Sequence, residues 1–267
     1  MTRALFAKEL KQYRTSFLVW SLTIIALIAM TMAAMPTMMA SAGLKDLLNA
    51  YPPAFLRAFS FDLSSFSDPL GFYVVYATLY VALLGSVFSI SVAAGIIHKE
   101  QSLGTAEFLL AKPLSRNQIF GAKLAAYLLL VLAINVIAFF AAWTSLLAFS
   151  PGPFRLGALV IVSTYCLLLS LAMGGIGLLT SLTVKRMRSL IGPAIGIVLG
   201  FYLWDTITKI ASQYEAWGWL SPFKWVDVKV TVPDYGFAWW RLVLFTALIV
   251  GCFLSSLVVY RKKDILT

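Results

Sequence analysis

The sequence predicts an all-α integral membrane protein with six transmembrane helices. Hydrophobic residues fill 61% of the 267 positions, charged residues fill only 12%, and the mean hydropathy is +0.89. A water-soluble domain cannot cover that much apolar surface with polar side chains, so lipid must be the solvent for much of the chain. Because backbone polar groups in lipid must be paired within their own segment, these spans are expected to be helices.

Six apolar stretches reach the length of about 20 residues that a helix needs to cross a bilayer. They cover residues 17–35, 69–97, 119–149, 156–184, 189–210 and 237–260. An A-x-A site at 40–42 would suit signal cleavage, but the apolar run before it is longer than usual for a signal peptide, which favours a retained span. No polar segment is long enough for a soluble domain, so residues 1–267 are predicted to form a single transmembrane domain.

Local signals place several element ends. Residues 3–14 mix apolar and basic side chains, which predicts an amphipathic helix on the inner leaflet before the first span, or else a solvated basic segment. Asp68 and Pro69 suit the N-cap and the first residue of the second span. A Pro- and Gly-containing turn at 150–153 separates the third and fourth spans, and a short basic turn at 184–188 separates the fourth and fifth.

Two predicted outer segments are longer than turns. Residues 43–66 hold leucines and phenylalanines among few charges, which predicts short interfacial helices broken at Pro52 and Pro53. Residues 213–235 are rich in tryptophan and other aromatics. Aromatics at this depth favour a membrane-interface belt, and an extracellular gate or substrate contact is the alternative.

The basic residues give the chain a direction across the membrane. With the N-terminus inside, the inner segments hold 14 Lys and Arg against four acids, and the outer segments hold seven against seven. The whole net charge of +10 then lies on one side, which predicts that both termini are cytoplasmic and that the chain resides in the cell (inner or plasma) membrane. This asymmetry explains the high pI without nucleic acid, and the basic rim suits anionic lipid.

Motifs for chemistry within the chain are missing. The sequence lacks HExxH, GxSxG and the P-loop pattern, so no catalytic, cofactor-binding or metal-binding residues are expected in this chain. His98 has no ligand set around it, and Cys166 and Cys252 read as small buried hydrophobes. Asp205 and Lys209, four residues apart near the outer end of the fifth span, form either a local ion pair or a substrate contact.

Small residues suggest where helices approach closely. Gly192, Gly196 and Gly200 form a GxxxGxxxG pattern in the fifth span. Such spacing lets helix backbones meet where hydrophobicity cannot drive association. The stripe therefore predicts packing within the chain or, alternatively, a subunit interface or moving seam.

The strongest motif lies in the polar loop between the second and third spans. Its residues, in order, are Glu100, Gly104, Thr105, Glu107, Leu109, Leu110, Pro113, Leu114, Ser115, Arg116, Ile119 and Lys123. The pattern resembles the inner loop of ABC transporter permeases of the type-2 exporter class, where a Glu precedes Gly-Thr-Leu-Glu, Leu-Leu, Pro-Leu-Ser-Arg and a later Lys. The chain departs from this pattern at Ala106, where such loops commonly have Leu. The smaller side chain leaves less apolar surface for one contact with the separate ATPase on which such loops dock.

The resemblance implies a cytoplasmic coupling helix that docks on a separate ATPase. It also implies two ATPase copies, a second permease subunit that is identical or paralogous, and ATP and Mg bound only by the ATPase. Thr105 can cap such a helix and Glu107 can occupy its first turn. Few polar groups line the spans, so the expected function is ATP-driven export of a hydrophobic or amphipathic substrate such as a lipid, peptide antibiotic or drug. The alternative is a membrane scaffold or sensor whose loop lies on lipid headgroups.

Overall fold

The structure is a computed structural model that describes residues 2–40, 50–52, 56, 69–102, 115–150, 152–183, 191–226 and 238–262. Every regular element in these ranges is a helix. The elements are α1 (Thr2–Ala40), α4 (Pro69–Phe72), the π-helical turn η2 (Tyr73–Ala77), α5 (Thr78–Ser102), α7 (Arg116–Phe149), α8 (Leu156–Thr183), α9 (Ile191–Ile210), the 3₁₀ segments η3 (Ser212–Leu220) and η4 (Lys224–Val226), and α10 (Trp239–Lys262).

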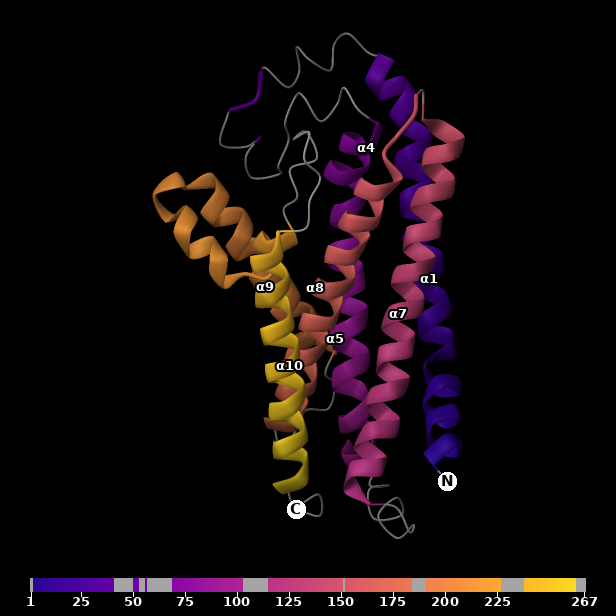
Figure 1. Ribbon diagram of the computed structural model, residues 1–267, viewed down its shortest axis with the longest axis vertical. Helices are drawn as coiled ribbons and strands as arrows, with labels where there is room; N and C mark the ends of the chain where they lie inside the picture. The colour runs from indigo at the N-terminus through magenta and orange to yellow at the C-terminus, as the bar shows by residue number, and fades with distance from the viewer. Residues whose placement is uncertain are drawn as a thin grey trace.

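The long helices form an elongated bundle (Figure 1). α1 and α7 pack along one flank, α5 and α8 pack in the middle, and α9 and α10 lie on the other flank. α1 begins, α5 ends, α7 begins and α10 ends at one end of the bundle, which we call the loop end. α5 is the most buried of the long helices because it touches neighbours on both sides, whereas α10 is the least buried.

Within the part of the chain that the structure describes, five helices are long and apolar enough to cross a membrane: α1 up to Met39, the α4–α5 segment up to Ile97, α7, α8 and α10. They coincide with five of the six predicted spans. The second begins at Pro69 as predicted and the third ends at Phe149 as predicted. The predicted fifth span is the 20-residue helix α9, whose role as a span stays a prediction.

The outer surfaces of these helices are apolar, so they need lipid or a partner protein to cover them. Large hydrophobic side chains stand exposed along α1 and α7, among them Leu18, Leu22, Met30, Leu132, Phe140 and Leu147. A monomeric soluble protein rarely exposes contiguous apolar surface of this extent. The bundle is therefore built for a bilayer, in agreement with its composition.

The prediction that residues 3–14 form a separate amphipathic helix is wrong. α1 runs unbroken from Thr2 to Ala40, contains no glycine, and has its one proline, Pro36, close to its end. Leu5 and Glu9 are buried against other helices, so residues 3–14 pack against the helix bundle as the first turns of α1. At 1.5 Å per residue α1 is about 58 Å long, far longer than the roughly 30 Å hydrocarbon layer.

Other differences from the predicted elements concern helix ends and turns. α5 continues to Ser102 and α7 already begins at Arg116, so Glu100 and Arg116 lie in helices and not in a loop. The second span also contains the π-helical turn at Tyr73–Ala77, which apolar periodicity does not reveal. Most of the interfacial helices predicted over 43–66 and the whole basic turn at 184–188 lie outside the described residues.

Candidate functional site

The candidate docking loop is described only where it joins the helices. Gly104, Thr105, Glu107, Leu109, Leu110, Pro113 and Leu114 all lie outside the described residues. The two helices that carry the loop, α5 and α7, are described and stand next to each other at the loop end. We call α5 and α7 the stems of the loop. The structure therefore shows how the stems are held, and the docking role of the loop residues stays a prediction.

Ser115 and Arg116 have structural partners within the chain. Ser115 is the N-cap of α7: its side chain accepts from the backbone N–H of Gln118 at 3.3 Å, and its own N–H donates to Gln118 Oε1 at 3.0 Å. This reciprocal capping box satisfies two donors that a helix start would otherwise leave unpaired. Arg116 Nη1 donates to the Arg261 carbonyl at 3.1 Å. Arg116 of the loop motif thus contacts the end of α10.

Two further contacts tie the start of α7 to α10. Arg261 Nε donates to Asn117 Oδ1 at 2.8 Å, and the rings of Phe120 and Tyr260 lie 5.3 Å apart between centroids. These residues come from the first turn and a half of α7 and the last turn of α10. The helix that leaves the candidate loop is therefore fixed to the C-terminal helix.

A buried ion pair joins α7 to α1 and α5 at the same end. Lys123 Nζ lies 2.8 Å from Glu9 Oε1 and donates to the Ile96 carbonyl at 2.6 Å. The Lys123 and Glu9 side chains are each only 3% exposed. A buried ammonium is costly unless it is both paired and hydrogen-bonded, and Lys123 meets both conditions. The sequence analysis placed Lys123 at the end of the loop motif and counted Glu9 only as an inner-side charge, and it did not pair the two. The available signal was a lysine just inside a predicted span and a lone acid in a basic segment.

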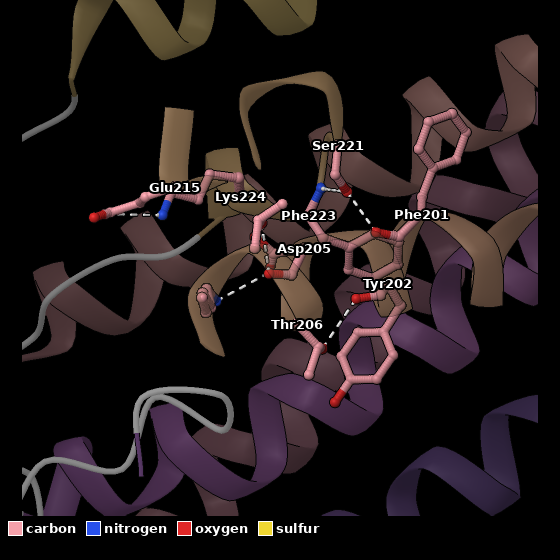
Figure 2. Close-up of polar contacts among 10 residues, drawn as sticks. Phe201, Tyr202, Asp205, Thr206, Glu215, Ser221, Phe223 and Lys224 are labelled. Carbon is pink, nitrogen blue, oxygen red and sulfur yellow. Dashed lines mark hydrogen bonds and ion pairs between the residues drawn. The ribbon is translucent and has the colours of Figure 1, made fainter. Parts of the chain in front are cut away.

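The opposite end of the bundle carries a small polar cap over α9 (Figure 2). Lys209 Nζ lies 2.9 Å from Asp205 Oδ2, so these two candidate residues form the local ion pair that their spacing allows. Ser221 Oγ donates to the Phe201 carbonyl at 2.7 Å and thereby fastens the segment after η3 back onto α9. Lys224 reaches Glu215 at 3.4 Å, an ion pair at the surface.

Aromatic side chains cover this cap. Trp204 Nε1 donates to the Trp217 carbonyl at 2.9 Å, and the rings of Trp219 and Trp240 meet edge to face at 4.8 Å. Trp204 remains 43% exposed. Half-buried tryptophans with a partner for the indole N–H are typical of a membrane interface. The aromatic segment thus has the features expected of an interface belt.

The glycines of α9 and α8 behave differently. No heavy atom of the described chain lies within 4 Å of a Cβ built on Gly192, Gly196 or Gly200, and these positions are exposed. Among the described residues, this face of α9 therefore meets no other helix, and the packing or subunit interface that the GxxxGxxxG spacing favours stays a prediction. In α8, by contrast, Gly174 and Gly177 lie against α7 and α5, where an added Cβ would collide.

Several polar side chains within the bundle form hydrogen bonds to other groups of the chain. Tyr127 hydroxyl lies 2.9 Å from Ser89 Oγ, which donates to the Ser170 carbonyl and so links α7, α5 and α8. Asn135 and Thr164 donate to carbonyls four residues earlier on their own helices. These groups are hydrogen-bonded within the chain, whereas the hydroxyls of Ser21, Ser86 and Ser256 are buried and have no hydrogen-bond partner among the described residues.

A family comparison decides what kind of membrane protein this bundle is. The model of the ABC-2 family transporter proteins matches residues 3–265, nearly the whole chain. The chain belongs to this ABC-2 family. A search of the curated proteins found no match to it.

Membership makes the chain a membrane-embedded permease component of an ABC transporter, which agrees with the resemblance of the loop motif. The ATPase of an ABC-2 transporter is a separate subunit, so this permease is expected to work with one.

Proposed function

We propose that this chain is the permease subunit of an ATP-driven exporter in the cell membrane. The loop end is its cytoplasmic end, and residues 103–114 dock on a separate ATPase that holds ATP and Mg. Two ATPase copies and a second permease, identical or paralogous, complete the transporter. The observation that carries the proposal is the family match over residues 3–265 together with the loop motif carried by α5 and α7.

The proposed substrate is hydrophobic or amphipathic: a lipid, a peptide antibiotic or a drug. Several polar groups inside the bundle are bonded to their own helices, as Asn135 and Thr164 are. Large apolar side chains stand exposed along α1, α7 and α9. A strongly charged solute would lose its hydration without gaining partners along such surfaces.

The test is affinity purification of the full chain from its native membrane in mild detergent. We expect a P-loop ATPase at one copy per permease, and Glu107→Lys in the candidate loop should abolish its recovery while membrane insertion is unchanged. Glu215→Lys is the matched control because Glu215 is 66% exposed at the other end of the bundle. Recovery of the wild-type chain without an ATPase, even after crosslinking, would instead favour the scaffold or sensor.

A further inference from the structure

The first turns of α1 present one continuous stripe to the rest of the bundle. Leu5, Glu9 and Tyr13 recur every four residues and therefore share one face of the helix. Leu5 packs with Ile119 of α7 in a small apolar cluster. We call this segment, residues 2–14, the foot of α1.

Each position of the stripe contacts a stem of the candidate docking loop. Glu9 reaches Lys123 of α7, as described above. Tyr13 lies against α5 at Gly95, where a Cβ would stand 2.7 Å from the Tyr13 hydroxyl. The foot thus touches both the helix that enters the loop and the helix that leaves it.

The ion pair sits at the base of the loop and not within it. Lys123 lies two turns, about 10 Å, beyond the first residue of α7, and Ile96 lies about 9 Å before the last residue of α5. The Lys123 ammonium therefore bridges the two stems at a similar distance from the loop, and Glu9 joins α1 at that level. We call Glu9, Lys123 and the Ile96 carbonyl the foot clasp.

Stability alone does not account for a buried charge pair at this position. Well-packed apolar side chains of similar volume are often as stabilising as a buried ion pair, or more so. An ion pair differs in what it enforces: both charges must stay within contact distance, since separating them leaves each buried and unpaired. The foot clasp therefore keeps α1, α5 and α7 at fixed positions relative to one another when a force acts on the loop.

We infer that the foot clasp makes α1 move together with the stems of the 103–114 loop, so that an ATP-driven displacement of the loop reaches α1 directly. Glu9 and Lys123 are positioning residues in this role. The inference rests on the proposed function, because the displacement comes from the docked ATPase. It extends that function by adding α1, distant in sequence from the loop, to the helices that the ATPase drives.

The experiment compares two charge deletions in the full chain, purified with its ATPase and placed in nanodiscs. Glu9→Leu with Lys123→Met removes the clasp and leaves an apolar pair. Glu215→Leu with Lys224→Met removes the surface pair at the other end and serves as control. Lys123→Arg keeps the charge and should preserve coupling.

Spin labels at Lys11 and Ala125 report the distance between the foot and α7. Both side chains are exposed, while the native Cys166 and Cys252 are buried. The wild type and the control should give one distance distribution with and without Mg-ATP and vanadate. The clasp-deleted variant should match them without nucleotide and diverge from them with it. Its permease-dependent stimulation of the ATPase should fall by at least roughly fivefold, the lower end of ordinary coupling effects.

The possible results separate the two claims. A clasp-deleted variant that keeps its distance distribution and its ATPase stimulation overturns the foot clasp while the exporter stands. A wild-type distance that itself changes with nucleotide also overturns it. A wild-type preparation that contains no ATPase overturns the exporter and the transmission role together. A divergence confined to the nucleotide-bound state supports the clasp, because a purely structural defect would change both states.

Discussion

Gly177→Ala is the substitution whose effect on packing the structure predicts most directly. A Cβ at this position of α8 would lie 2.7 Å from Ile90 Cγ1, 2.8 Å from the Ile90 carbonyl oxygen and 3.2 Å from its Cα. The side-chain atom can rotate away, but the two backbone atoms belong to the centre of α5. The methyl group is therefore accommodated only if α5 and α8 move apart.

The magnitude follows from that separation. Restoring ordinary van der Waals distances requires a shift of roughly 0.5 Å along this helix pair. Overpacking of this kind typically costs about 1–3 kcal/mol, and the helix preference for alanine over glycine offsets about 0.5–1 kcal/mol. We expect a net destabilisation of about 1–2 kcal/mol and a Tm lower by about 2–8 °C.

The two native cysteines supply the assay. Cys166 and Cys252 are buried, so a thiol-reactive dye should react only as the bundle opens on heating in detergent. Gly196→Ala is the matched control, since no described atom lies within 4 Å of its added Cβ. Equal melting temperatures for the two alanine variants would refute the claim that α5 and α8 meet backbone to backbone at Gly177.

The same melting assay checks three further predictions. Glu9→Leu leaves the Lys123 ammonium buried without its carboxylate and should cost about 3–5 kcal/mol, most of which Lys123→Met should restore in the double variant. If the double variant melts as low as the single, the cost comes from lost packing and not from the charge. Ser115→Ala removes the N-cap of α7 and should cost about 1 kcal/mol, with faster amide exchange over the first turn of that helix as its signature. Glu215→Gln should change stability by less than about 0.5 kcal/mol, and a larger loss would mean that the surface pair with Lys224 matters more than its exposure implies.

The long elements were predictable because apolar length is a strong signal in lipid. The start of the second span at Pro69 was predictable from the sequence Asp68–Pro69, and the end of the third at Phe149 from the Pro- and Gly-containing sequence after it. The buried state of Cys166 and Cys252 followed from their apolar surroundings. Each of these features depends on residues close together in the sequence.

Features that depend on which face of a helix meets a neighbour were not predictable in the same way. The glycine stripe at 192–200 has the better packing spacing, yet the glycines of α8 make the close contacts, because spacing does not say what lies opposite. Residues 3–14 read as amphipathic, yet the apolar face packs on protein and not on lipid. The pairing of Glu9 with Lys123 spans 114 positions and has no local signature.

The unbroken course of α1 also constrains its length. Each residue of an α-helix turns the chain by about 100° and advances it by about 1.5 Å. Deleting a single residue between Glu9 and the bilayer would therefore rotate Glu9 a quarter-turn away from Lys123, even if every remaining side chain were suitable. Point substitutions on the outward face, at Lys8 or Lys11 for instance, leave that geometry intact. This helix is accordingly expected to accept changes of chemistry on its exposed side far more readily than a change in residue number.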